Sequence, residues 1–296
     1  MWYNLIVTFD SVTQIVCLAE KEGRPISEIV IHSQSEEMQL SSEEIFRRMK
    51  KNYDVMKAAA KAGLDKGLRS ASGLVGGDAF QLFQRSEKGG LVGSFLLRAM
   101  ARSMGIAEYN ASMGKIVAAP TAGSCGILPA AVITVAEEFG LSDDKAVMSL
   151  FTAGAFGLVI AKNASISGAE GGCQAECGSA SAMTAAAIVE LMDGMPHQCG
   201  QACAMALKNV LGLVCDPVAG LVEIPCVKRN VSGLTLAFTA AEMALAGIES
   251  RIPPDEVILT MQRIGAVLPE SLRESGTGGL AATPTGIRLK QKIFGG

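Results

Sequence analysis

The feature of this sequence that most limits its fold is the lack of any sustained alternation between apolar and polar residues beyond about residue 104. A half-buried strand requires that alternation. Apolar residues make up 49% of the chain but aromatic residues only 5%, so the apolar content is Ala, Val, Ile, Leu and Met, which mostly favour helices. We therefore predict an all-α, mainly helical protein, a compact multi-helix bundle of a dozen or so elements with glycine-rich loops.

Local signals place several of these helices. Residues 41–44, Ser-Ser-Glu-Glu, form a capping box. The helix that follows should end near Gly63, and its apolar series is Ile45, Met49, Tyr53, Met56 and Ala60. Further helices are expected over residues 11–21, from there to about 38, from 93 to about 104, and over 128–139. We divide the chain into an N-terminal appendage, residues 1–40, and one main helical domain, residues 41–296.

Charge and hydropathy argue against two classes of partner. The net charge of −3 provides no basic surface for nucleic acid. The mean hydropathy of +0.32 raises the question of a membrane, but the uncharged run over residues 146–161 is short for a span. The N-terminus has no basic segment before its apolar start, so we expect no signal peptide. Eight cysteines in such a chain predict free thiols in a reducing cytoplasm.

Six of the eight cysteines lie between residues 171 and 230. Cys215 and Cys226 each stand beside a proline, which interrupts regular helix, and Cys173 follows the glycine-rich run 168–172. Three thiols on irregular bends form a candidate metal site. The alternative is that they are ordinary buried cysteines, as free cysteines commonly are. We expect that simpler role for the other three, Cys177, Cys199 and Cys203.

A second informative stretch is the small-residue loop from Pro120 to Gly126, which precedes a strongly helical run. Its backbone N–H groups, at the positive end of a helix, suit a carboxylate or phosphate. The candidate anion-binding residues are Thr121, Ala122, Gly123 and Ser124. The loop is not a P-loop, and a plain tight bend is the alternative. Cys125 is either a fourth metal ligand or a small packing residue.

Two weaker features remain. The third glycine-rich run, residues 274–279, is either a loop that closes over a substrate or a simple C-terminal connection. His197, at an expected helix start, is either a general base or an exposed or capping residue. His32 has no supporting pattern.

Four segments together resemble the iron–sulfur-dependent L-serine dehydratases, and more narrowly the separate α subunit of the two-subunit bacterial form. The resemblance covers nearly the whole chain and is weakest over the first forty residues. The segments are GKIVAAPTAGSCGILPA, SGAEGGCQAECGSASAM, LGLVCDPVAGLVEIPCVKRN and ESGTGGLAATPTG.

The resemblance implies a 4Fe–4S cluster held by three cysteines, which map onto Cys173, Cys215 and Cys226. Single-chain members can end in a cysteine that reaches the cluster, whereas this chain ends in Phe294-Gly295-Gly296. The fourth iron should then be open to water or substrate, as a catalytic metal requires. The family's β domain is absent here, which implies a β-subunit partner; homo-oligomerisation is a further expectation.

The implied reaction is elimination of water from L-serine to give pyruvate and ammonia, without pyridoxal phosphate, since no lysine here has a recognisable Schiff-base motif. The loop at 121–124 would hold the substrate carboxylate. The base stays open among Lys115, His197, Glu223 and a group from the partner. Selectivity for serine, threonine or cysteine also stays open. The competing functions are a cluster-bearing redox or iron sensor, a cysteine-desulfidating lyase and a helical membrane transporter.

Overall fold

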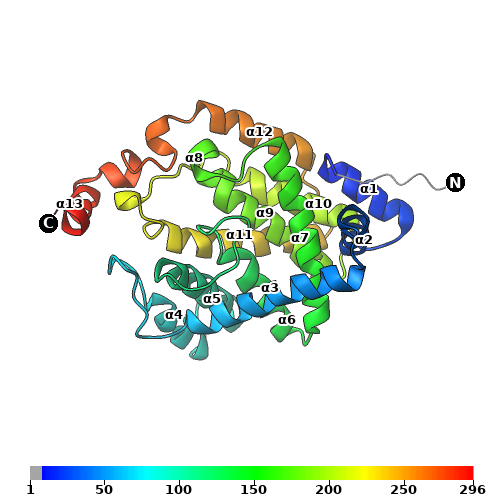
Figure 1. Cartoon of the computed structure of the whole chain (residues 1–296), viewed down its shortest axis with the longest axis horizontal. Coiled ribbons are helices and arrows are strands. Elements are labelled where there is room, and N and C mark those ends of the chain that lie inside the picture. Colours follow the sequence, from blue (N-terminus) through cyan, green and yellow to red (C-terminus); the bar gives the residue numbers. More distant parts are fainter. Residues whose placement is uncertain (1–8, 296) are drawn as a thin grey trace.

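The computed structural model describes residues 9–295 and is built from α-helices (Figure 1). No strand occurs in this range, and the one β-bridge joins Cys215 to Arg273. The all-α prediction is therefore confirmed. The helices are α1 (Val12–Glu22), α2 (Ile26–Met38), α3 (Ser42–Ala62), α4 (Asp78–Glu87), α5 (Gly93–Ala111), α6 (Ile127–Glu138), α7 (Asp143–Asn163), α8 (Gly168–Gly171), α9 (Ser179–Leu191), α10 (Pro196–Lys208), α11 (Cys226–Leu245), α12 (Pro254–Val267) and α13 (Pro284–Phe294).

Four shorter turns complete the chain. A π-helix, η1 (Gln174–Gly178), leads into α9, and three 3₁₀ turns lie nearer the C-terminus. These turns are η2 (Val218–Gly220), η3 (Glu270–Leu272) and η4 (Gly279–Ala282). A π-helix inside or beside an α-helix often marks a functional site, because its wider turn displaces side chains from the regular helical face.

Of the five helices whose bounds were predicted, four begin and end within a few residues of the expected positions. The side chain of Ser41 caps α3 by accepting the N–H of Glu44 at 3.2 Å, and α1 ends at Gly23 in the left-handed conformation (φ 64°). Two differences stand out. Helix α5 continues to Ala111, beyond the expected end near residue 104, and α4 was not anticipated. Glu108 on α5 accepts the N–H groups of residues 77–79, so α4 begins at a cap that comes from a distant helix.

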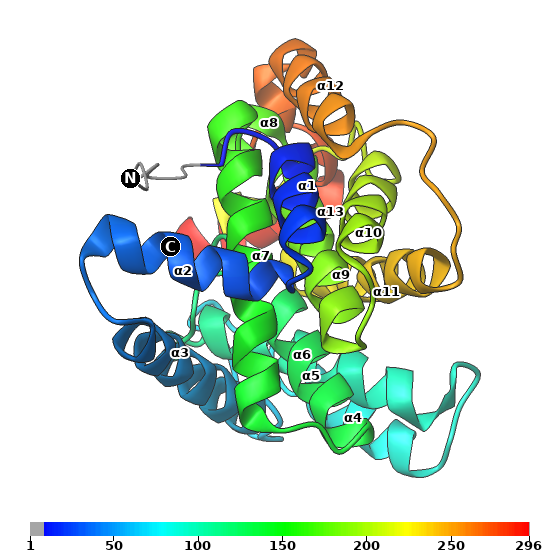
Figure 2. The same cartoon turned by 90° about the vertical axis from the view of Figure 1, so that its right-hand side faces the viewer.

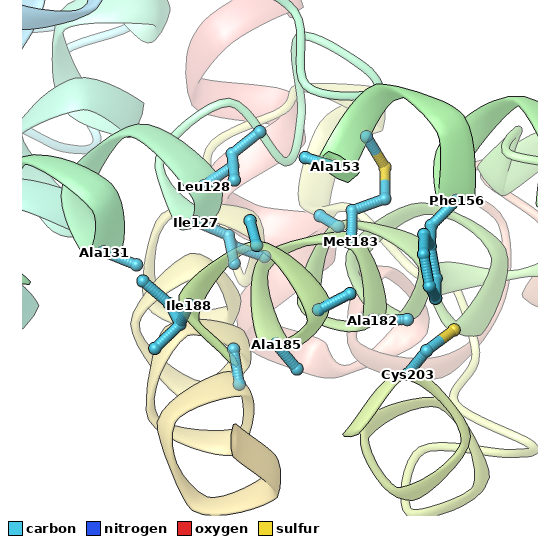
Figure 3. Close-up of a cluster of buried hydrophobic side chains, with 14 of the residues drawn as sticks. Ile127, Leu128, Ala131, Ala153, Phe156, Ala182, Met183, Ala185, Ile188 and Cys203 are labelled. Atoms are coloured by element: carbon cyan, nitrogen blue, oxygen red, sulfur yellow. The ribbon is translucent and has the colours of Figure 1, made fainter. Parts of the chain in front are cut away.

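Helix α9 lies at the centre of the bundle, and α6, α7, α10 and α11 pack around it. Its sequence, SASAMTAAAIVEL, is almost entirely buried, and the many small side chains allow close approach of the neighbouring helices. Figure 3 shows Ala182, Met183 and Ile188 of α9 among side chains of α6 and α7. Cys203 of α10 lies in this core near Phe156, as expected for a packing cysteine.

Helix α7 is the one helix in the described chain that is long and apolar enough to cross a membrane. However, 67% of its most apolar window is buried inside the bundle. Packing against α2, α3 and α9 therefore accounts for its apolar composition.

The two ends of the described chain lie on opposite sides of the molecule (Figure 1). Helices α1 and α2 pack at one side, where residues such as Ile15 and Ile26 join the same hydrophobic core as α9 (Figure 2). At the other side, α13 packs against η2 and η4. The segment between α10 and α11 and the segment between α12 and α13 thus meet at one end of the bundle. The cysteines of interest lie there.

Candidate cluster and substrate site

The structure brings Cys173, Cys215 and Cys226 together from three separate segments. Cys173 precedes η1, Cys215 lies on the extended link after α10, and Cys226 is the first residue of α11. All three are buried. Burial raises the pKa of Cys215 and of Cys226, and the negative charge of Cys173 raises both further, so the thiols lie within electrostatic range of one another.

The expectation that all three cysteines stand on irregular bends is only partly correct. The segment around Cys226 was expected to be poor helix, yet α11 starts at this residue and continues for twenty residues. Pro225 explains the difference, because proline is compatible with the start of a helix, where no N–H is needed. Cys215 does occupy an extended link: its N–H donates to the carbonyl of Leu272 at 2.8 Å.

The three thiols do not form a site for a single metal ion in the described chain. Within residues 9–295, no group of three or more His, Cys, Asp or Glu side chains is arranged to hold one metal ion. In a four-iron cluster each thiolate binds a different iron, so the ligands stand apart. Gly168 contributes room: a Cβ at this position would lie 3.0 Å from the sulfur of Cys215. The space beside the Cys215 sulfur therefore depends on glycine at position 168.

Cys173 is the thiol most readily ionised. A hydrogen bond from Cys177 lowers the pKa of Cys173, and the Arg229 guanidinium lowers it further, against the opposing effect of burial. The thiolate is the form that binds metal. Cys177 was expected to be a packing residue, and it is buried as expected; it also donates this hydrogen bond from the π-helix.

Arg229 also ties the segments of the site together. It forms a partly buried ion pair with Asp216 at 2.9 Å and donates to the carbonyl of Val214 at 2.8 Å. Asp216 in turn accepts the N–H of Leu280 at 2.8 Å. This chain of contacts joins α11, the link that carries Cys215, and the C-terminal segment.

The glycine-rich loop at residues 120–126 lies next to these thiols. The backbone N–H groups of Thr121, Ala122 and Gly123 donate no hydrogen bond to any described residue. Such N–H groups before a helix form an anion-binding concavity. The Ser124 hydroxyl lies 3.0 Å from the hydroxyl of Thr121, within hydrogen-bonding distance.

Asn230 fixes this loop to the first turn of α11. Its side chain is fully buried; Oδ1 accepts the N–H of Gly126 at 2.9 Å. Its Nδ2 donates to the carbonyls of Gly123 at 2.7 Å and Cys226 at 2.9 Å. One side chain therefore sets the distance between the anion-binding loop and the Cys226 thiol.

Glu176 lies between the loop and the thiols, and sequence reasoning missed it. Its Oε1 accepts the Thr121 hydroxyl at 2.5 Å, and a Cβ on Gly123 would lie 2.5 Å from the same oxygen. Burial raises the pKa of Glu176, the Thr121 hydrogen bond opposes this shift, and the charge of Glu274 adds to it. The signal that could have identified Glu176 in the sequence is a carboxylate within a run of Gly, Ala and Cys.

Comparison with known proteins identifies the family of this chain. The profile of the family described as "Serine dehydratase alpha chain" matches residues 21–281. The chain belongs to this family. It is 52% identical over 290 residues to the "Probable L-serine dehydratase, alpha chain" of Bacillus subtilis, covering 97% of this chain and 96% of that relative. It is 42% identical to the "L-serine dehydratase, alpha chain" of Peptoniphilus asaccharolyticus, over 95% of this chain and 97% of the relative.

Longer members of the family match over part of their length. The "L-serine dehydratase TdcG" of Escherichia coli is 43% identical over 182 residues, which is 60% of this chain and 40% of that relative. The same core thus occurs both as a chain of this length and inside larger proteins.

The three candidate bases lie in three different environments. Glu223, three residues before Cys226, is buried, and its Oε2 accepts the hydroxyls of Ser70 and Ser72 at 2.7 Å each. Lys115 is exposed in the link before the loop. His197 lies at the start of α10, 3.2 Å from Glu20 of α1, and lines a surface pocket that none of the three cysteines reaches.

The remaining predicted features are also placed. Cys125 is fully buried in the core, and its thiol faces the carbonyl of Ile106 at 4.0 Å. The third glycine-rich run lies against the site: the N–H of Glu274 donates to the carbonyl of Cys215 at 2.7 Å. A Cβ on Gly279 would lie 2.4 Å from Asp216, so this close approach requires glycine.

Proposed function

We propose that this chain is the α subunit of an L-serine dehydratase, which converts L-serine to pyruvate and ammonia at a 4Fe–4S cluster held by Cys173, Cys215 and Cys226. The family membership supports the reaction. The observation that supports the site is the placement of three buried thiols beside a loop with unpaired backbone N–H groups. One end of a small amino acid can bind the loop while its hydroxyl group faces the thiols.

When bound, the cluster supplies a Lewis acid for the serine hydroxyl, which is otherwise a poor leaving group. The residues of this chain do the rest. The N–H groups of residues 121–123 bind the substrate carboxylate and present Cα–H to a base. Burial of the site by α11 and the C-terminal segment excludes water. Loss of the Cα proton and the hydroxyl yields aminoacrylate, which tautomerises and hydrolyses to pyruvate and ammonia.

Pyridoxal phosphate is not part of this proposal. A pyridoxal enzyme places a Schiff-base lysine at its reaction centre. No lysine of this chain stands in a recognisable Schiff-base motif, and Lys115, which lies closest in sequence to the glycine-rich loop, is exposed. Among the base candidates, Glu223 is the one nearest in sequence to a proposed ligand, three residues before Cys226, and its carboxylate accepts the hydroxyls of Ser70 and Ser72.

A partner subunit and a cytoplasmic location complete the proposal. Relatives that match over nearly their full length are named alpha chains, whereas this chain matches 40% of a longer relative. We assign the unmatched part of the longer relative to a β subunit. The cysteines of the described chain form no disulfide, as free thiols in a reducing compartment would be.

Anaerobic purification with iron and sulfide analysis and a visible spectrum tests the cluster. The wild type should carry iron and sulfide in equal amounts, and Cys215→Ala should lose most of both. Cys203→Ala, a buried cysteine in the core, is the control and should retain them. Equal iron in Cys215→Ala and wild type would contradict the ligand assignment. A cluster that forms but gives no pyruvate with L-serine and the β partner would favour a sensor instead.

A further inference from the structure

Two carboxylates, Glu176 and Glu274, meet beside the Cys215 thiol. A Cβ on Gly168 would lie 2.9 Å from Oε2 of Glu274, 3.0 Å from the Cys215 sulfur and 3.5 Å from Oε2 of Glu176. The three groups therefore face one point next to α8. They come from three segments, since Glu176 belongs to η1 and Glu274 follows η3.

Neither carboxylate has a cationic partner in the described chain. Glu176 is 8% exposed and uses Oε1 for the Thr121 hydroxyl, whereas its Oε2 accepts no hydrogen bond. The side chain of Glu274 is partly buried and has no hydrogen bond or ion pair. Two like charges that are removed from water and left uncompensated are costly, unless a cation joins them.

The surroundings indicate what that cation is. Thr121 bonds Glu176 and also belongs to the loop whose N–H groups suit a carboxylate. The carboxylates that could bind a cation and the N–H groups that could bind an anion therefore meet at Thr121. An α-amino acid has both ends, with an ammonium group that donates three hydrogen bonds and a carboxylate that only accepts.

We infer that Glu176 and Glu274 bind the α-ammonium group of the substrate while the backbone of residues 121–123 binds its carboxylate. This inference rests on the proposed function. It explains why the site would select an amino acid over a carboxylic acid that has no ammonium group. With two substituents of Cα fixed, the Cα–H bond and the side chain have defined directions. Glu176 and Glu274 are positioning residues in this scheme.

The test compares two unreactive ligands that differ in the ammonium group, L-alanine and propionate. Their affinities for the cluster-loaded α–β complex are measured by ligand-detected NMR titration, which reads millimolar dissociation constants. Glu176→Gln and Glu274→Gln should each weaken L-alanine binding by roughly tenfold to a hundredfold. Propionate binding should stay within about twofold in both variants, because propionate has no ammonium group to lose a partner.

Glu170→Gln is the matched control, since Glu170 is an exposed carboxylate on α8 that bonds Ser165. It should bind both ligands as the wild type does. Equal weakening of both ligands, or no change in either, would overturn the inference. If buried Glu176→Gln does not fold, the more exposed Glu274→Gln tests the inference by itself. Pyruvate formation from L-serine by the wild type is assayed separately, so failure of the proposed function is distinguishable from failure of this inference.

Discussion

At Gly123 only a hydrogen atom separates the backbone of the anion-binding loop from the carboxylate of Glu176. A Cβ there would lie 2.5 Å from Oε1 and 3.0 Å from Cδ of Glu176. We predict that Gly123→Ala displaces the loop and lowers kcat/KM for L-serine by roughly tenfold to a hundredfold, because a small misplacement of the bound substrate strongly lowers the reaction rate. Steady-state kinetics of the cluster-loaded complex, with iron content measured in parallel, tests this prediction.

Gly154→Ala provides the control for that experiment. Gly154 lies within α7, and a Cβ there would meet nothing within 4 Å. This variant should keep wild-type kinetics and gain about 0.5–1 kcal/mol in unfolding free energy, because alanine favours helix over glycine. Wild-type KM and kcat in Gly123→Ala would show that the loop does not position the substrate.

Residue by residue, the sequence indicated the candidate site residues whose signal is local. Proline and glycine neighbours drew attention to Cys173, Cys215 and Cys226, and the family resemblance assigned them as ligands. Glu176 escaped notice because its role depends on Thr121, which is 55 residues away in sequence. A buried carboxylate can be recognised only once the fold shows what surrounds it.

At the scale of elements, Glu190 is a buried carboxylate that joins α9 to α2. It accepts the Thr152 hydroxyl at 2.6 Å and the N–H of Ser27 at 3.2 Å. Burial raises the pKa of Glu190 above its ordinary value of 4.5, and these hydrogen bonds oppose the shift. The folded state therefore holds the proton more tightly than the unfolded state. The contribution of Glu190 to stability is present below about pH 4.5 and is lost as the pH rises through the folded-state pKa.

Glu190→Gln removes this titration while its carbonyl oxygen can still accept from Thr152. We predict that the unfolding free energy of the variant, relative to wild type, increases as the pH rises above 4.5. Urea unfolding at a series of pH values measures the difference. Thr152→Val removes a hydrogen bond that stabilises the charged form of Glu190. The loss of unfolding free energy with rising pH should therefore be larger in this variant than in wild type. A difference that does not change with pH would refute the assignment.

The helices themselves show which elements a sequence can specify. Helix α3 was predicted because its cap, Ser41, is adjacent to it in the chain. Helix α4 was missed because its first N–H groups are satisfied by Glu108, about thirty residues further on. Likewise α11 starts directly after Pro225, where local reasoning expected irregular chain. The cap of α3 is adjacent in sequence and could be recognised, whereas the cap of α4 comes from a residue about thirty positions away and could not.

At the scale of the whole molecule, one end of the bundle is assembled from segments that are far apart in sequence. Asp216 accepts the N–H of Leu280 and forms an ion pair with Arg229. The N–H of Glu274, in the segment between α12 and α13, donates to the carbonyl of Cys215. Helix α13 extends beyond this end, with Ile287 and Phe294 48% and 61% exposed. The C-terminal segment thus belongs to the site and also forms part of its outer surface.

The dependence on a partner is the prediction that concerns the entire assembly. This chain supplies thiols, a glycine-rich loop and carboxylates, but matches only 40% of the longer relative named L-serine dehydratase TdcG. We predict that the cluster-loaded chain alone forms pyruvate from L-serine at less than about a hundredth of the rate of the complex with its β subunit, as expected when positioning groups are missing. A coupled pyruvate assay over increasing β-subunit concentration measures this, and the rate should saturate at a fixed stoichiometry. Full activity of the isolated chain would show that Lys115, Glu223 or another residue of this chain suffices as the base.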